Sequence, residues 1–477
     1  MLCVTVTPKS RTLAKVDILN AAGRGDIVEV CLDHLVKDPD FSDLLESRPK
    51  PILLSCRRPE EGGAFSGTDE ERVQLLKRAI VAKPDYIELD VAAARQVKRF
   101  GEVKRVVSFT RLDRPESQPA SLIDEADAAD ADIVKFMWPT ETIEDAWPLL
   151  ALTAAKTKLP VVGLGIGPCG LTFSLLALRY GAPWVYAALE PGMEVCDGQS
   201  TLFELQERHR ASTIGRGTSF VGITGHDEAT LQAATAMNAA FAEVGRDARC
   251  LPMTIRSPKT LPERLEKLKI KTVLPVGGDG ELLASIATAG ETGRPDVLMR
   301  KAEGWTGFRT LGRAALKQLK KVYEIDWRRA NVLVLGMSGL GETIARDLVA
   351  EGAMVSLCAQ SEQSVAGLAS ELGCRTIPLK QLYNTLSDVV VIADDSLQMG
   401  TGRTEINPAY LRPTMTVLDV TSLPGLHPLG VEARERGCRL IDPGAIYALH
   451  LDAVFKTLTG APLPETARAM LSGSVTT

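Results

Sequence analysis

The chain has 477 residues, of which 45% are hydrophobic and 24% charged, and its formal net charge is −5 at pH 7. This length exceeds what one hydrophobic core usually supports, so we expect at least two domains. The acidic balance, without a clustered basic stripe, argues against a nucleic-acid-binding surface. No apolar run approaches the roughly 18 residues that span a bilayer, and the N-terminus lacks a signal-peptide pattern, so we expect no membrane partner and a cytoplasmic location.

Nine cysteines are scattered along the chain without a C-x-x-C pair. An odd number without metal-ligand spacing predicts reduced thiols and no metal site. Most of these side chains are expected to be buried as small hydrophobic groups.

Eight short apolar runs alternate with amphipathic segments over about the first 200 residues. The runs are unbroken rather than alternating, as expected for parallel strands that are buried on both faces. Eight strand–helix units predict an α/β fold that begins with a (β/α)8 (TIM) barrel rather than an open sheet. The runs lie at 2–8, 26–33, 51–57, 86–91, 105–110, 132–138, 159–167 and 184–190.

A lysine in the sixth apolar run is the most informative single residue of this half. Lys135 interrupts the run at 132–138. Burial there is expected to lower the pKa of the amine and favour its neutral form, which can attack a ketone and form a Schiff base. The alternative is a lysine near a strand end whose amine reaches solvent.

Further polar residues lie in or after other strands of the expected barrel. Glu29 lies in the second run, Arg57 and Glu61 at or after the end of the third, and Gln199 after the eighth. Segments that follow the strands build the catalytic rim of such a barrel, so these side chains are expected to meet at one mouth. Taken alone, Arg57 and Glu61 also fit a charged turn beside a flexible glycine pair.

The order of these motifs resembles the type I 3-dehydroquinate dehydratase family over nearly all of residues 1–205. The resemblance implies that Lys135 forms an imine with 3-dehydroquinate and that water is then eliminated. It places Glu61 at the position that orients the family's catalytic histidine. The substrate-contacting positions of the family fall on Glu29, Arg57 and Gln199.

Several positions of the family pattern carry other residues in this chain. Thr110 stands where the family has its general acid–base histidine, and Cys31 stands where it has an arginine near the second-strand glutamate. Ser174 replaces an arginine that holds the substrate carboxylate. General acid–base catalysis is worth about 100- to 10,000-fold, so imine formation is expected to survive these changes better than rapid dehydration.

After a polar linker at 206–220, the alternation of strands and helices restarts. A glycine-rich turn at 336–341 lies between an apolar strand and a helix. This context brings backbone N–H groups at the helix N-terminus close to a pyrophosphate. The residues at 359–361, after the next strand, select neither NAD nor NADP. The expected cofactor-binding residues are Gly336, Ser338, Gly339 and Gly341.

This second half resembles shikimate dehydrogenase over nearly its whole length, and fusions of the two enzymes in this order are a known architecture of the shikimate pathway. The resemblance implies a two-lobed module with a Rossmann domain that binds NADP. Gly277 and Phe308 stand where the family has the lysine and aspartate of its proton relay. Leu231 and Ala233 stand where it has two serines that hold the substrate. Dehydrogenase activity is therefore expected to be lost.

The sequence predicts three domains: a dehydratase-like barrel at 1–207, a substrate domain at 218–325, and a Rossmann domain at 326–477 whose last helix returns to the cleft. Three functions remain open: a bifunctional dehydratase and dehydrogenase, an enzyme that uses Lys135 alone, and a catalytically degenerate regulatory protein. The expected ligands are a cyclic keto acid such as 3-dehydroquinate and, in the second half, NADP. The barrel is expected to need no cofactor, and a homo-oligomer is left open.

Overall fold

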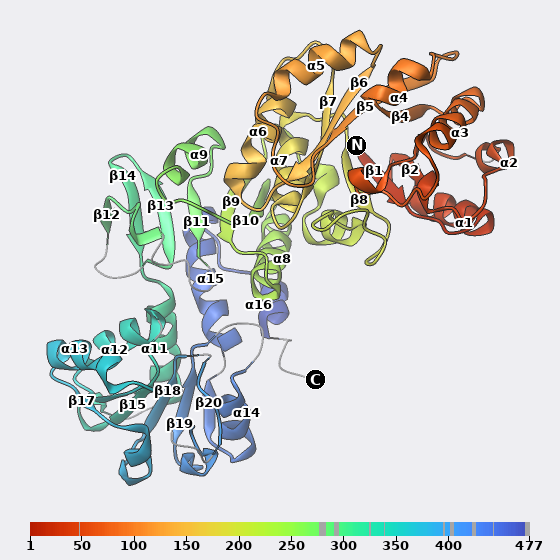
Figure 1. Cartoon of the computed structure of the whole chain (residues 1–477). Helices are drawn as coiled ribbons and strands as arrows, with labels where there is room; N and C mark the ends of the chain where they lie inside the picture. The colour runs from red at the N-terminus through yellow and green to blue at the C-terminus, as the bar shows by residue number, and fades with distance from the viewer. Residues whose placement is uncertain are drawn as a thin grey trace. The chain divides into compact units, whose positions relative to one another are not determined.

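The computed structural model divides into two compact units. The first contains Met1–Ser219 and Leu251–Thr260, and the second contains Phe220–Cys250 and Leu261–Thr477. Figure 1 colours the chain continuously from its N-terminus to its C-terminus. The structure describes residues 1–46, 48–275, 283–290, 295–323, 326–337, 339–394, 396–400, 405–421, 426–441 and 443–472.

Eight parallel strands form the centre of the first unit, in the order β7-β6-β5-β4-β3-β2-β1-β8. Because β8 pairs with β1, the sheet curves into a nearly closed barrel, which confirms the fold expected from the eight apolar runs. The strands are β1 (Leu2–Val6), β2 (Ile27–Cys31), β3 (Ile52–Ser55), β4 (Tyr86–Asp90), β5 (Lys104–Thr110), β6 (Ile133–Pro139), β7 (Val161–Ile166) and β8 (Val185–Ala188).

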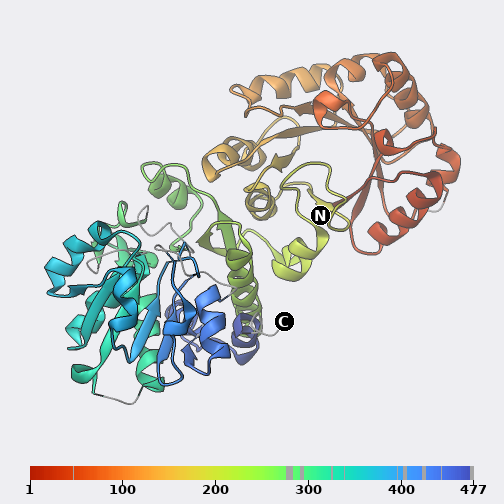
Figure 2. The ribbon, with the colours of Figure 1, turned by 60° about the horizontal axis from the view of Figure 1, so that its bottom comes forward.

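Helices surround these strands on the outside of the barrel (Figure 2). Helix α3 shows why they form: Thr68 and Glu71 make a capping box at its start, and three acidic residues occupy its first turn. The short turns η1 (Leu32–His34) and η2 (Pro59–Glu61) follow β2 and β3, and the π-helical turn η3 (Glu204–Arg208) follows β8. The helices are α1 (Arg11–Ala22), α2 (Phe41–Leu45), α3 (Asp69–Val81), α4 (Val91–Gln96), α5 (Pro119–Ala128), α6 (Ile143–Ala154) and α7 (Gly170–Tyr180).

The first sheet after the barrel is mixed, in the order β10-β9-β11-β13-β14-β12, with β13 antiparallel to both of its neighbours. Phe241 of α8 and Phe455 of α15 pack in one hydrophobic cluster with residues of this sheet. Its strands are β9 (Ser219–Thr224), β10 (Ala248–Met253), β11 (Thr272–Leu274), β12 (Ala289–Gly290), β13 (Val297–Lys301) and β14 (Gly304–Phe308). The helices are α8 (Glu228–Glu243), α9 (Leu261–Lys267), α11 (Leu311–Val322), α15 (Pro443–Thr459) and α16 (Glu465–Ser472).

The last sheet is parallel throughout, in the order β17-β16-β15-β18-β19-β20. The chain starts in the middle and winds outwards in both directions, as in a Rossmann fold, which confirms the prediction for this part. No helix in the described part of the chain is long and apolar enough to cross a membrane. The elements are β15 (Asn331–Leu335), α12 (Gly339–Ala350), β16 (Met354–Cys358), α13 (Glu362–Leu372), β17 (Arg375–Thr376), β18 (Val389–Ile392), β19 (Thr416–Asp419), α14 (Pro428–Glu435) and β20 (Arg439–Ile441).

Candidate active site

Lys135 lies in β6 with its side chain inside the barrel, and only 1% of it is exposed. Its Nζ donates a hydrogen bond to Oε2 of Glu88 at 2.7 Å and lies 3.5 Å from Oε1 of Glu29. The same nitrogen lies 4.3 Å from the centre of the Tyr186 ring, so the amine also makes a cation–π contact. The alternative of a lysine that reaches solvent is therefore wrong.

The expected neutral state of Lys135 is also wrong. Burial disfavours the ammonium, but the carboxylates of Glu29 and Glu88 outweigh this effect and hold the pKa of Lys135 above its usual value. Desolvation alone would lower the pKa of Lys135, as the sequence predicts, but the two carboxylates beside the amine reverse this effect. Lys135 is therefore an ammonium in the resting protein, and it must lose a proton before it can attack a carbonyl group.

Glu88 was not among the residues predicted from the sequence. It lies in β4, is 3% exposed, and its Oε1 has no hydrogen-bond partner among the described residues. Burial raises the pKa of Glu88, although Lys135 and Arg57 act in the opposite direction. The signal that could have identified it is the one that identified Lys135: a charged residue inside an otherwise apolar run.

Arg57 and Glu29 complete a group of four buried charges. Nη2 of Arg57 lies 3.6 Å from Oε1 of Glu29 and donates to Sγ of Cys31 at 3.2 Å. Oε2 of Glu29 accepts a hydrogen bond from the Thr5 hydroxyl at 2.8 Å. Burial would raise the pKa of Glu29, but Lys135 and Arg57 outweigh it and lower the pKa to about 2. Two cations therefore compensate two carboxylates inside the barrel.

Gln199 reaches this group from the loop after β8. Its Nε2 donates to the Thr5 hydroxyl at 3.1 Å, and that hydroxyl in turn donates to Glu29. Its Oε1 accepts from the backbone N–H of Val195 at 2.8 Å, which fixes the amide orientation. The structure thus joins four of the residues expected from the sequence in one polar network: Glu29, Arg57, Lys135 and Gln199.

Glu61 is held by a neighbour rather than by this network. Its carboxylate accepts hydrogen bonds from the backbone N–H, Nε and Nη2 of Arg58 at 3.2, 3.1 and 2.9 Å. Thr110 at the end of β5 offers no imidazole for Glu61 to orient. Cys31 and Ser174, which the resemblance places at arginine positions of the family, are both buried and uncharged at neutral pH.

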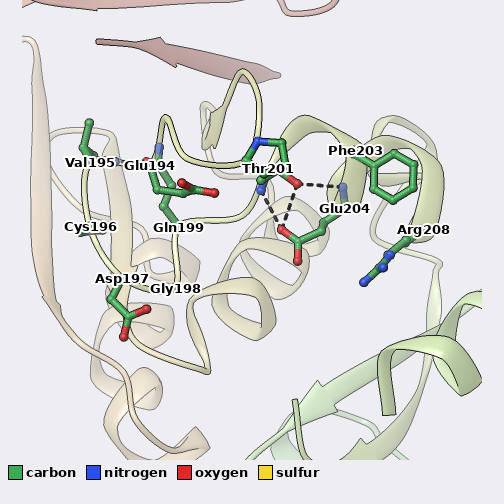
Figure 3. A pocket seen from close by; sticks show the side chains of 11 residues that line it. Glu194, Val195, Cys196, Asp197, Gly198, Gln199, Thr201, Phe203, Glu204 and Arg208 are labelled. Carbon is green, nitrogen blue, oxygen red and sulfur yellow. Dashed lines mark hydrogen bonds between the residues drawn. The ribbon is translucent and has the colours of Figure 1, made fainter. Parts of the chain in front are cut away.

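A pocket of about 570 Å³ opens beside Gln199 (Figure 3). The loop after β8 and η3 supply its lining, which includes Glu194, Asp197 and Glu204. Arg208 is the basic residue of this lining. Figure 3 shows the Glu204 carboxylate turned back to the start of its own helical turn, where it caps backbone and hydroxyl groups. The lining of the pocket therefore combines apolar and uncharged residues with carboxylates and one guanidinium.

The loop that forms this pocket also covers the interior of the barrel. Val195 and Cys196 pack against the hydrophobic cluster inside the strands. The loop is held down because the Gly167 N–H donates to the carbonyl of Asp197 at 2.8 Å. A Cβ added at Gly198 would lie 1.9 Å from the carbonyl oxygen of Gly167, so this close approach requires glycine.

The glycine-rich turn of the second half lies between β15 and α12. Gly336 follows β15 with a φ of 85°, and a Cβ there would lie 2.1 Å from the Cβ of Asp394. A Cβ at Gly341 would lie 2.7 Å from a side chain that follows β18. Helix α12 begins at Gly339, whereas Ser338 lies outside the described residues. Strand, glycine turn and helix follow one another here as in dinucleotide-binding folds, so the turn fits such a ligand.

Two positions of the second half correspond to the proton relay that the resemblance implies. Phe308 ends β14, and Gly277 lies outside the described residues. His450, at a late glutamine position of the dehydrogenase pattern, is completely buried, and its Nδ1 lies 2.7 Å from the hydroxyl of Thr310. Burial lowers the pKa of His450, although Asp296 acts in the opposite direction.

The fold and the site define a (β/α)8 barrel protein with a buried lysine, followed by a Rossmann-type module. Residues 2–215 match the family model of type I 3-dehydroquinase. A 3-dehydroquinate dehydratase of Dehalococcoides mccartyi is 30% identical over 168 residues, which are 34% of this chain and 76% of that protein. The chain belongs to the type I 3-dehydroquinase family.

Similarity to a fused protein extends across both halves. The chloroplastic bifunctional 3-dehydroquinate dehydratase/shikimate dehydrogenase of Arabidopsis thaliana is 23% identical over 505 residues, covering 98% of this chain and 83% of that one. A solved shikimate dehydrogenase from Aquifex aeolicus covers 55% of this chain and 99% of its own, with 21% identity and a TM-score of 0.47. The match to the bifunctional protein confirms the fused order predicted from the sequence.

Proposed function

We propose that the barrel of this protein is a Schiff-base lyase that acts on a cyclic keto acid such as 3-dehydroquinate. The observation that carries this proposal is the buried amine of Lys135, held at 2.7 Å by a carboxylate inside the barrel. Burying an ammonium is costly even when it is paired, and such charge clusters in enzymes concentrate at functional sites. Glu29, Arg57 and Gln199 supply the contacts to the substrate.

The proposed lyase reaction depends on the amine of Lys135. Lys135 forms an imine with the substrate ketone. A base then removes the proton of a C–H bond beside the imine, and the electrons of that bond move into the protonated imine. The hydroxyl group on the next carbon then leaves as water, and hydrolysis of the imine releases the unsaturated product. Because Thr110 replaces the histidine, we expect turnover about 100- to 10,000-fold below that of a barrel with a positioned acid–base group.

A second candidate function is a binding protein that holds a keto acid without turning it over. The specific observation in its favour is that Cys31 and Ser174 place no cation at the two arginine positions of the family.

For the second half, we propose that the turn after β15 binds NADP without reducing 3-dehydroshikimate. The bound dinucleotide would supply hydride chemistry, but Phe308 and Gly277 supply no proton for the product alkoxide.

Absorbance of the unsaturated product tests the lyase proposal with the purified full chain. We expect slow product formation from 3-dehydroquinate, and none in Lys135→Ala. Lys158→Ala is the matched control, because the side chain of this lysine is 64% exposed and pairs with Asp127. Equal turnover in the wild type and Lys135→Ala would contradict the lyase. A complete absence of product would favour the binding protein.

A further inference from the structure

The family histidine that moves protons is replaced by Thr110, yet the ammonium of Lys135 must lose a proton before it can react. We propose that Glu88 takes this role, accepting the proton of Lys135 and delivering it to the substrate oxygen during imine formation. The inference rests on the lyase function proposed above. It assigns a catalytic role to Glu88, because this side chain touches the reacting nitrogen.

The two carboxylates beside Lys135 are not equivalent. Glu29 uses Oε2 to accept from Thr5, and its Oε1 lies 3.5 Å from Lys135 and 3.6 Å from Arg57. Glu88 uses Oε2 for Lys135, whereas its Oε1 has no partner in the described part of the chain. Glu88 therefore has a free oxygen that can carry a proton without breaking another hydrogen bond.

The electrostatic surroundings support the same assignment. The pKa of Glu29 is lowered to about 2, so it stays ionised, whereas burial raises the pKa of Glu88. Groups from several strands face Glu88: Glu29 from β2, Arg57 after β3, Lys135 from β6, Cys3 from β1 and Tyr186 from β8. Burial holds the pKa values of the Cys3 thiol and the Tyr186 phenol well above their usual values, so neither accepts the proton. Among these groups, Glu88 is the one suited to exchange it.

The proposed step balances without another reactant. The ammonium of Lys135 gives one proton to Glu88, and the neutral nitrogen attacks the carbonyl carbon while the C=O π electrons move to oxygen. Glu88 protonates this oxygen, which forms the carbinolamine, and then takes a second proton from nitrogen. It returns this proton to the hydroxyl group, which leaves as water while the nitrogen lone pair forms the C=N bond. The products are a protonated imine, one water molecule and an ionised Glu88.

Removing the charge of Glu88 affects the rate of imine formation in two opposite ways, so the direction of the change in rate tests the inference. The carboxylate raises the pKa of Lys135, so Glu88→Gln leaves more of the amine neutral and ready to attack. If Glu88 were only a charge partner, this variant would form the imine at least as fast as the wild type. If Glu88 carries the proton, the variant is slower despite its more nucleophilic amine.

The experiment measures how fast the full chain forms an adduct with 3-dehydroquinate in the presence of cyanoborohydride, which reduces the imine, followed by intact mass across pH. We expect Glu88→Gln to form the adduct about 100-fold more slowly than the wild type. Asp90→Asn is the matched control: it removes a carboxylate from the same strand, but one that pairs with Arg72 at 2.6 Å. This control is expected to react at the wild-type rate.

The outcomes separate this inference from the lyase proposal. An adduct that forms in Glu88→Gln as fast as in the wild type overturns the role of Glu88 and leaves the imine at Lys135 standing. No adduct in the wild type overturns both. If Glu88→Gln does not fold, Glu88→Asp is measured instead, since it keeps the acid but withdraws it by one methylene. That variant is expected to be about 10- to 100-fold slower, and an unchanged rate would overturn the inference.

Discussion

Lys135 and Arg57 face Glu29 and Glu88 within one closed cluster, so each charge depends on the other three. Removing one member of a buried ion pair leaves its partner uncompensated, which costs about 3–5 kcal/mol. The resemblance implies that a histidine and two arginines of the family are replaced in this chain, but the four charges of this cluster balance. The interior of the barrel thus holds a compensated set of charges.

The pH dependence of the stability of Glu29→Gln tests this balance of buried charges. The pKa of Glu29 lies near 2 in the folded protein against an ordinary value of 4.5, so its contribution to stability is present above pH 4.5 and lost as the pH falls towards 2. We expect Glu29→Gln to be less stable than the wild type by about 3 kcal/mol at neutral pH. Chemical denaturation is expected to show this difference shrinking below pH 4.5. A difference that stays constant with pH would contradict the ionised state of Glu29.

Thr110→His tests whether a missing acid–base group limits turnover. Thr110 ends β5, the strand that pairs with β6 and therefore with Lys135. We expect the histidine to raise the dehydration rate of 3-dehydroquinate by about tenfold or more, because it restores a second proton carrier. Thr110→Val is the control for the change in shape. An unchanged rate in a folded Thr110→His protein would indicate that the barrel has been rebuilt for another substrate.

The strands could be predicted from the sequence, whereas the contacts between side chains across the barrel could not. The run at 86–91 was expected from its apolar residues and is β4 (Tyr86–Asp90). That Glu88 of this strand meets Lys135 of β6 depends on how the barrel closes, which no local pattern encodes. The pKa of Lys135 was mispredicted for the same reason, since its sign is set by side chains distant in the sequence.

The turn after β3 positions Arg57 and is the element whose distortion we expect to disable the site. A Cβ added at Gly63 would lie 2.2 Å from the carbonyl oxygen of Arg57, so Gly63→Ala must displace this backbone. Loss of about 1–3 kcal/mol of stability is expected, together with slower adduct formation at Lys135. Gly217→Ala is the control, because no atom of the described residues lies within 4 Å of a Cβ at that position. Equal adduct rates in the two variants would show that the turn does not position Arg57.

The two halves of the chain differ in the polar groups that the structure describes. The barrel retains its amine and a balanced charge cluster, whereas the second half retains a glycine turn without the residues of a proton relay at the described positions. The fused order could be predicted because each half carries its own local motifs. Whether both halves still catalyse a reaction could not be predicted, because activity depends on groups that only folding brings together.

Calorimetry with NADP and an absorbance assay for shikimate oxidation together test the proposal that the second half binds NADP without catalysing hydride transfer. We expect binding without NADPH formation, since hydride transfer from the alcohol needs a base to accept its proton. Gly336→Val is expected to abolish binding, because its φ of 85° and the nearby Asp394 leave no room for a side chain. The same variant should leave adduct formation at Lys135 unchanged. Shikimate-dependent reduction of NADP at ordinary enzyme rates would contradict the loss of the proton relay.

Peptide mapping after trapping tests whether the barrel acts through an imine at Lys135. The full chain is incubated with 3-dehydroquinate and cyanoborohydride, digested, and analysed by tandem mass spectrometry. We expect a mass increase at Lys135 in the peptide that contains it, and no labelled peptide from Lys135→Ala. Label confined to other lysines, or an unmodified Lys135 after prolonged reaction with a folded protein, would contradict it.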